Sequence, residues 1–443
     1  MKTNLRVKLG VIVATLGLVS AMAVVDAGAS ATLNGDLTFA AADGAASLNP
    51  AMGGSSFDEP FFNSAIPTFM SEAARVSGSN APSAISLYSP TGSSAGKKGV
   101  IAGTYAVGAS DVPMGTVVNG VNLDASSLTN ANAATTLSSY TQVPVVLGGV
   151  GMMYNLPSLT KKFGKYPVIL NSTVLADIYD GVTTKWNSAA ICKLNPKIVN
   201  VKKNKKGKVI HSTCAMPNLP IVPVYRADGS GTTFIFMDYL NQTQGANFKT
   251  PAGAEVYPGT SFNQGQVPTT ALGGQKNAGV AADVEQTVGG VGYVEYSYIL
   301  LQHTLPAARI VNAKHQIESL SETSVAADAA AFSSTPPKEN ANGQVSSFSI
   351  VNGTGSGDYP IAGYSWAILR SDWNGIGTVG GVSGLNGEKL VAKFLDWCVQ
   401  GGTNGGQHVA MEQGYVPLPS YVTTLAEQQV ASLTYNNQSL GLN

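Results

Sequence analysis

The feature that most constrains the fold is a glycine turn at residues 226–234, with the sequence R-A-D-G-S-G-T-T-F. The apolar run 219–225 before it predicts a buried strand, and residues 234–240 after it have the apolar spacing of a helix. The free N–H groups and the dipole of a first helical turn favour negative charge. A strand, a tight turn and a hydroxyl-rich helix start therefore predict a cradle for an oxyanion.

The side chains of this turn add donors to the predicted cradle. Arg226 supplies a planar guanidinium that matches two phosphate oxygens, and Ser230, Thr232 and Thr233 supply hydroxyl groups. A helix cap after a turn explains the same residues without a ligand, so the turn alone leaves both interpretations open.

Composition limits the function classes. Of the 443 residues, 12% are charged and 44% hydrophobic, and the formal net charge is zero. A neutral chain is a poor partner for nucleic acid or an anionic membrane, so neither is expected. The four histidines and three cysteines lack metal-ligand spacing, so we expect no metal site, haem or other cofactor.

The N-terminus has the pattern of a secretory signal peptide. Three basic residues, Lys2, Arg6 and Lys8, precede an apolar stretch at 10–25, and small-residue cleavage sites follow. We expect residues 1–31 to be removed by cleavage after Ala29 or Ala31; an uncleaved membrane anchor is the alternative. No cysteine stands directly after the apolar stretch, at the place where a lipid would be attached. The pattern therefore predicts a periplasmic or extracellular protein without a lipid anchor.

Export makes the cysteines interpretable. Cys192 and Cys214 enclose 21 residues, and Cys398 lies far away in an apolar helical pattern, so we predict a Cys192–Cys214 disulfide and a buried free Cys398. Residues 199–210 alternate around N-K-K-G, which predicts a lysine-tipped β-hairpin within 192–214. A solvated hairpin and a docking patch for an acidic surface are both compatible with its lysines.

Apolar strand patterns alternate with helical patterns along the chain, which predicts an α/β protein. We expect strands at 84–88, 105–109 and 143–147, helices at 57–74, 172–179 and 390–399, and a connector or surface loop at 334–358.

Three further turns resemble the first one in composition. They lie at residues 53–57 (G-G-S-S-F), 91–96 (T-G-S-S-A-G) and 108–111 (G-A-S-D), and the first two lead into predicted helices. Gly-Ser turns are common, and helix caps prefer serine, so each turn alone is weak. Together, converging helix starts can enclose a dehydrated tetrahedral anion without a positive surface.

In this order, the four motifs resemble the phosphate-binding protein of ABC-type phosphate importers. Further landmarks agree in order and spacing over roughly residues 50 to 430. They are V-G-M-M-Y-N-L-P at 150–157, L-A-D-I-Y-D-G at 175–181, K-W-N at 185–187, L-N-P at 194–196, G-G-V-G-Y-V-E-Y at 289–296 and Y-V-P-L-P at 415–419.

The resemblance implies a site for inorganic phosphate. Its members would be Ser56 and Phe57, Ser93 at its helix start, Asp111 as an acceptor, Arg226 as the charged fork, and Ser230, Gly231 and Thr232 as the opposing cradle. Asp228 would brace Arg226 from behind.

The chain departs from the family pattern after Phe57. Asp58 and Glu59 stand where small residues are usual, and they add negative charge near an anion site. Because acidic residues in a first helical turn suit the helix dipole, we expect both to point outward.

Asp111 would select the ligand. A carboxylate repels an oxyanion unless the anion still carries a proton, and phosphate does so near neutral pH whereas sulfate does not. Leaving a buried acceptor unpaired can reject an analogue by about 10⁴–10⁵. A turn carboxylate that caps a nearby N–H is the alternative for Asp111.

Enzyme interpretations are weaker. Ser230 lacks the G-x-S-x-G elbow and a nearby histidine. Residues 92–98 are one residue short of a nucleotide loop and lack the hydroxyl residue after lysine.

We therefore expect a two-lobe periplasmic-binding-protein fold that is not an enzyme and acts as a monomer. Lobe I would combine residues 33–140 with 358–443, lobe II would be residues 141–357, and phosphate bound between them would pass to the membrane permease of an ABC importer. An exported phosphatase or phosphoester hydrolase with the same fold is the alternative, and an extracellular structural or adhesive protein that retains the fold is another.

Overall fold

The computed structural model describes residues 37–39, 49–118, 121–122, 124, 137–164, 167–245, 268–301, 305–340, 343–374 and 377–442. The predicted signal peptide, residues 1–31, lies outside them. In the described part of the chain, no helix has the length and hydrophobicity that a membrane crossing requires.

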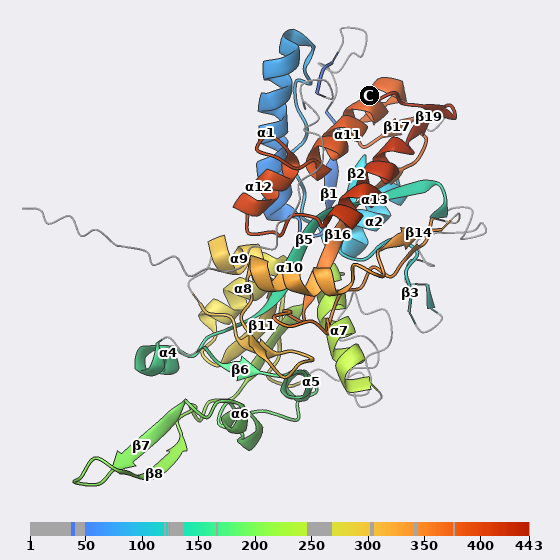
Figure 1. Ribbon diagram of the computed structural model, residues 1–443. Helices are drawn as coiled ribbons and strands as arrows, with labels where there is room; N and C mark the ends of the chain where they lie inside the picture. The colour runs from blue at the N-terminus through green and yellow to red at the C-terminus, as the bar shows by residue number, and fades with distance from the viewer. Residues whose placement is uncertain are drawn as a thin grey trace, which may run out of the picture. The chain divides into compact units, whose positions relative to one another are not determined.

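A mixed β-sheet runs through the centre of residues 33–443 (Figure 1). Its seven described strands follow the order β1-β2-β16-β5-β11-β9-β10. Pairs β1–β2, β11–β9 and β9–β10 are parallel, and the pairs of β16 with β2 and β5, and of β5 with β11, are antiparallel. The bounds are β1 Met52–Gly54, β2 Val107–Ser110, β16 Ala362–Arg370, β5 Tyr140–Tyr154, β11 Gly290–Glu295, β9 Val222–Arg226 and β10 Leu272–Gly274.

Strand β5 links the two halves of this sheet. Residues 140–149 pair with β16, and residues 150–154 pair with β11. All fifteen residues of β5 are buried, as its continuous apolar run requires. The predicted lobe boundary at 140/141 falls where β5 begins; the division into lobes stays a prediction.

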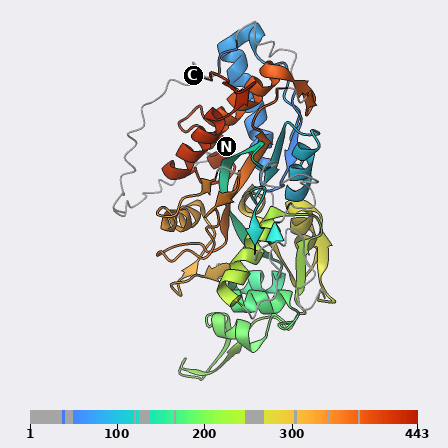
Figure 2. The same ribbon diagram turned by 90° about the vertical axis from the view of Figure 1, so that its right-hand side faces the viewer.

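Helices cover both halves of the sheet (Figures 1 and 2). Helices α1, α11, α12 and α13 pack around the end that carries β1, β2 and β16, whereas α8 packs on β11, β9 and β10. An aromatic cluster fills the first core, where the rings of Phe62 and Tyr88 stack at 4.8 Å and Phe69 meets Phe394 edge-on at 5.1 Å. The helices are α1 Glu59–Ser77, α2 Ser93–Ile101, α4 Pro157–Phe163, α5 Ser172–Tyr179, α6 Ala189–Leu194, α7 Gly231–Gln244, α8 Lys276–Gln286, α9 Tyr296–Leu301, α10 Glu322–Ala331, α11 Gly384–Val399, α12 Gly406–Glu412 and α13 Ser420–Ala431, with a 3-10 turn at Gly78–Asn80.

Short strands complete the described fold. Strands β13, β12 and β6 form a three-stranded sheet, and the others pair two by two. They are β3 Val117–Val118, β4 Val121–Asn122, β6 Ile169–Leu170, β7 Val199–Lys203, β8 Val209–Cys214, β12 Arg309–Val311, β13 Ile317–Glu318, β14 Lys338–Glu339, β15 Val345–Ser346, β17 Thr378–Val379, β18 Val382–Ser383, β19 Thr434–Tyr435 and β20 Gln438–Ser439.

The α/β class is confirmed, and so are the three predicted helices, which correspond to α1, α5 and α11. The strand predicted at 84–88 is wrong. This segment runs beside β1 through hydrogen bonds from Ser86 N to Pro50 O and from Ser89 N to Met52 O, with one isolated bridge at Ser89. It lies beside the outermost strand of the sheet, and Leu87 is 81% exposed, so only part of a ladder forms.

The lysine hairpin and its disulfide are confirmed. Cys192 and Cys214 are joined at an S–S distance of 2.03 Å, and β7 pairs with β8 in antiparallel register. The hairpin extends away from the central sheet (Figures 1 and 2). Its strand and turn lysines are exposed. Cys398 is buried and free on α11, as predicted.

Candidate functional site

Three helix starts converge at the middle of the structure, as the glycine turns predict. Helix α2 begins at Ser93 and α7 at Gly231, and α1 begins shortly after the turn that follows β1. Ser230 is the cap of α7, and its hydroxyl oxygen accepts a hydrogen bond from Thr233 N at 3.1 Å. The turn that follows β2 brings Asp111 to the same place, since its backbone N–H donates to Ser93 Oγ at 3.4 Å.

Arg226 lies at the end of β9 and is only 1% exposed. Its Nε donates to Asp228 Oδ1 at 2.7 Å and its second guanidinium nitrogen donates to Asp228 Oδ2 at 2.5 Å. Burial raises the pKa of Asp228, but the hydrogen bonds and charge of Arg226 outweigh it and hold that pKa below its ordinary value. Asp228 thus braces Arg226 as predicted, and the pair brings a charged fork into the interior without net charge.

Asp111 lies opposite this pair and is 2% exposed. Ser365 Oγ lies 2.8 Å from Asp111 Oδ1, and Thr232 Oγ1 donates to Asp111 Oδ2 at 3.3 Å. Burial raises the pKa of Asp111 to about 6, although the hydroxyls of Ser55 and Ser365 and the charge of Arg226 act to lower it. Asp111 is therefore ionised at neutral pH and is surrounded by donors.

Ser56 and Phe57 lie in the turn between β1 and α1, both fully buried. The Phe57 N–H donates to Ser55 Oγ at 2.9 Å. Ser56 Oγ accepts from the backbone N–H of Asn277 at 3.1 Å and from its side-chain amide at 3.2 Å, and the same amide donates to Thr232 Oγ1 at 3.3 Å. Sequence reasoning missed Asn277, which is fully buried. Its signal was a second Gly-Gly turn before a helix, at residues 273–277.

The predicted ligand groups donate to one another across the site. Gly231 N donates to Ser93 Oγ at 2.9 Å, and Ser94 N donates to Gly229 O at 3.3 Å. A Cβ atom at Gly231 would come within 2.4 Å of Asp111, so only glycine permits this approach. An oxyanion therefore enters between these groups only when the direct contacts open.

The outward orientation expected for Asp58 and Glu59 is wrong. Asp58 is fully buried, and its Oδ2 lies 2.7 Å from the hydroxyl of Ser365, the same hydroxyl that contacts Asp111. Glu59 accepts a hydrogen bond from Tyr298 OH. The reason is tertiary: the turn after β1 packs against β16, so its first acidic side chain points into the sheet rather than along the helix surface.

Glu295, the last residue of β11, is a second buried carboxyl that sequence reasoning missed. Its Oε2 accepts from the backbone N–H of Ser297 at 2.9 Å and from the Ser297 hydroxyl, and its own N–H donates to Asn277 Oδ1 at 3.1 Å. Burial raises the pKa of Glu295 to about 8. It lies inside the landmark at residues 289–296, where the pattern gave no sign of its burial.

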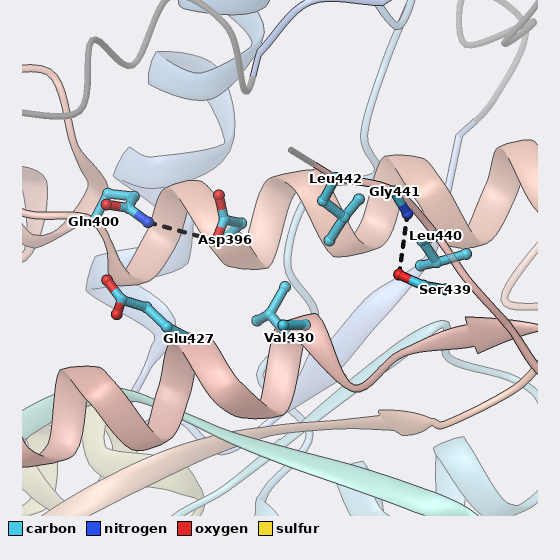
Figure 3. A pocket seen from close by; sticks show the side chains of 9 residues that line it. Asp396, Gln400, Glu427, Val430, Ser439, Leu440, Gly441 and Leu442 are labelled. Atoms are coloured by element: carbon cyan, nitrogen blue, oxygen red, sulfur yellow. Dashed lines mark hydrogen bonds between the residues drawn. The ribbon is translucent and has the colours of Figure 1, made fainter.

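Two other features of the described chain are unsuited to binding an anion. Lys97, which belongs to the loop-like run at 92–98, is buried in an ion pair with Asp124 at 2.8 Å. A cavity of about 250 Å³ lies between α11, α13 and the C-terminal segment, where the carboxylates of Asp396 and Glu427 disfavour an anion (Figure 3). Within the described residues, no cluster of three or more His, Cys, Asp or Glu side chains has the arrangement of a metal site.

Known proteins resemble the chain in sequence and in fold. The model of the PBP superfamily domain matches residues 40–401. The chain is 32% identical over 345 residues to the phosphate-binding protein PstS of Xylella fastidiosa (strain Temecula1 / ATCC 700964), covering 78% of this chain and 77% of that protein. It is 31% identical over 342 residues to PstS of Haemophilus influenzae, covering 77% and 83%.

Solved structures share the fold. A high-affinity periplasmic phosphate-binding protein, PfluDING, bound with phosphate, matches 86% of this chain and 93% of its own at a TM-score of 0.58 and 19% identity. A DING protein matches 86% and 94% at a TM-score of 0.59 and 18% identity. At these identities the likeness concerns the fold, and it agrees with the predicted periplasmic-binding-protein architecture.

Proposed function

The chain belongs to the PstS family of phosphate-binding proteins within the PBP superfamily, and from this premise we propose that it captures inorganic phosphate between Arg226 and Asp111. As a member of a family of binding proteins, it is not an enzyme. The bound species is HPO₄²⁻ or H₂PO₄⁻, and no cofactor takes part.

One observation supports the proposal most directly: Arg226, held by Asp228, and the carboxyl group of Asp111 are buried at the same converging helix starts. Arg226 and the N–H groups of α7 supply donors for the unprotonated oxygens, together with the hydroxyls of Ser230 and Thr232. Asp111 supplies an acceptor for a protonated oxygen. Ser56, Phe57, Ser93 and Gly231 complete the proposed ligand set.

Asp111 favours phosphate over sulfate. Phosphate retains a proton near neutral pH and donates it to the carboxylate, whereas sulfate has none and meets like charge at short range. The pKa of about 6 for Asp111 keeps this acceptor ionised at neutral pH. Leaving the buried acceptor unpaired penalises sulfate.

Binding requires an exchange of contacts. The N–H of Gly231 leaves Ser93 Oγ and donates to the anion instead. The hydroxyl of Thr232 likewise leaves Asp111 Oδ2 and donates to the anion. We infer that residues 33–140 with 358–443 form one lobe and 141–357 the other, and that they separate to admit phosphate and close around it. Because β5 pairs with β16 of the first lobe as far as Gly149 and with β11 of the second lobe from Val150, we infer that the chain crosses between the lobes there, nine residues beyond the boundary expected from the sequence. Phosphate stabilises the closed arrangement through its higher affinity for that state.

We further propose that the protein is exported by cleavage of residues 1–31, acts as a monomer in the periplasm, and delivers phosphate to the permease of an ABC importer. Family membership supports the periplasmic location and the transporter partner.

Calorimetry on the mature chain tests the proposal. Phosphate should bind at one site per chain and raise the unfolding temperature. A chromogenic phosphoester, incubated with metal-free and metal-loaded protein, should remain intact. Absence of phosphate binding, or sustained turnover of the ester, would contradict the proposed role.

A further inference from the structure

Asp58 contributes a carboxyl group to the site that the family pattern does not explain. It lies just before α1, is fully buried, and shares the Ser365 hydroxyl with Asp111. The two contacts measure 2.7 Å to Asp58 Oδ2 and 2.8 Å to Asp111 Oδ1. Both are ordinary lengths for hydrogen bonds between oxygen atoms.

The hydroxyl of Ser365 has too few hydrogens to donate to both carboxyl groups. A serine hydroxyl carries one hydrogen, so Ser365 donates to only one of the two carboxyl groups. The other contact, at the same short distance, needs a hydrogen from the carboxyl side. One of the two carboxyl groups therefore carries a proton and donates it to Ser365 Oγ.

The surroundings place that proton on Asp58. Asp111 receives donors from Ser55 and Thr232 and the charge of Arg226, all of which favour its ionised form. Asp58 has Ser365 alone, and its Oδ1 is buried without a hydrogen-bond partner. An unpaired oxygen of this kind is much less costly in a neutral acid than in a carboxylate. Burial, and then the charge of Asp111, raises the pKa of Asp58 well above its ordinary value.

We propose that Asp58 is a positioning residue of the phosphate site: as a neutral acid it donates to Ser365 Oγ, which turns its own hydrogen toward Asp111 Oδ1. Asp111 then stays ionised, with Oδ2 directed to Thr232 and to the hydroxyl of phosphate. This inference rests on the proposed function, and it goes further by giving a role to the acidic residue that departs from the family pattern.

The groups that face Asp58 determine its response to pH. They are the carboxyl groups of Asp111 and Glu295 and the phenols of Tyr88 and Tyr415. None of them carries positive charge, so loss of the Asp58 proton leaves it without a counter-ion and puts two carboxylates in competition for one hydroxyl. Phosphate affinity should then fall at alkaline pH.

Asp58→Asn tests the inference, because the amide is neutral at every pH and its N–H replaces the acid as donor to Ser365. Asp58→Ala removes the donor to Ser365, so its phosphate Kd at pH 7 should rise by about tenfold, whereas Asp58→Asn replaces one neutral donor with another and should restore most of the affinity. As alkaline pH removes the Asp58 proton, the wild type should weaken relative to Asp58→Asn. If Asp58 is ionised instead, Asp58→Asn removes a charge beside the anion and changes the Kd at pH 7 by more than about tenfold.

Infrared spectroscopy of the ligand-free proteins gives a second, independent readout. The difference spectrum of wild type minus Asp58→Asn at neutral pH should contain the carbonyl stretch of a protonated carboxyl group. Absence of that band overturns the inference even if phosphate binds. If the band is present but the wild type does not bind phosphate, the proposed function is wrong, although Asp58 is protonated as inferred.

Discussion

Two groups of buried charge meet at the proposed phosphate site, and they are neutralised in different ways. The Arg226–Asp228 pair balances its charge with a counter-ion, through hydrogen bonds of 2.7 and 2.5 Å. The cluster formed by Asp58, Ser365 and Asp111 contains two carboxyl groups and no counter-ion. A proton neutralises one of these carboxyl groups.

The difference determines how each side responds to pH. Because the Arg226 charge lowers the pKa of Asp228, the ion pair is stable above the ordinary pKa of an aspartate and is lost only as pH falls below it. On the carboxyl side, burial raises the pKa of Asp111 to about 6, and burial together with the charge of Asp111 raises the pKa of Asp58 well above its ordinary value. The donor side should therefore provide constant affinity, and the acceptor side should provide selectivity that depends on pH.

Removing the counter-ion side should have the largest effect. Arg226→Ala removes the charged donor and leaves the Asp228 carboxylate without its counter-ion, so phosphate affinity should fall by about 10²–10³-fold. Calorimetry measures this change. Arg226→Lys serves as the control, because it keeps the charge but not the planar fork, and its phosphate affinity should lie between those of the wild type and Arg226→Ala. A loss of less than about threefold for Arg226→Ala would show that the guanidinium is not part of the site.

Neutralising the acceptor should change selectivity rather than abolish binding. In Asp111→Asn the amide donates to an unprotonated oxygen, so sulfate no longer meets like charge. The preference for phosphate over sulfate should shrink to about 10²-fold or less, against about 10⁴-fold in the wild type. Competition calorimetry with both anions measures the ratio. An unchanged ratio would remove Asp111 from the account of selectivity.

Glu295 tests whether protons balance the acceptor side. Its folded-state pKa of about 8 exceeds the ordinary 4.5, so the stability it contributes is full below pH 4.5 and is lost as pH rises through about 8. Glu295→Gln should remove this loss of stability. As pH rises from 4.5 to about 8, the unfolding free energy of the variant should increase relative to that of the wild type by up to about 1.4 kcal/mol per pH unit.

Urea denaturation at several pH values measures the gain. Glu427→Gln on the exposed side of α13 is the matched control and should run parallel to the wild type. A difference between Glu295→Gln and wild type that stays constant with pH would mean that Glu295 is ionised in the folded protein.

The lysine hairpin should have the smallest effect. Its lysines are exposed and lie on a projection of the chain, so salt screens them from a buried site beyond about 8 Å at physiological ionic strength. Replacing Lys202, Lys203, Lys205, Lys206 and Lys208 with Gln should leave the phosphate Kd within about twofold. A tenfold loss would mean that surface charge, rather than the buried pair, drives anion capture.

The sequence predicted the parts of the site that depend on local geometry. Glycine turns at helix starts follow from short-range pattern, the Cys192–Cys214 pairing follows from the expected export, and the Arg226–Asp228 brace follows from the family resemblance. The errors concern long-range packing. Asp58 was expected at the surface because a helix start suits an acidic residue, but Ser365, 307 positions away, approaches it from β16.

Asn277 and Glu295 were missed for the same reason. Nothing in their neighbourhoods shows that one amide joins Ser56, Thr232 and the end of β11. A single sequence contains the order of the motifs but not the register in which β5, β11 and β16 bring them together.

The most direct test of the central claim is the ratio of sulfate to phosphate dissociation constants for the wild-type chain, measured by calorimetry at pH 7. Phosphate should bind more tightly than sulfate by about 10⁴-fold, because only phosphate donates a proton to Asp111. Equal affinity for the two anions would contradict the claim.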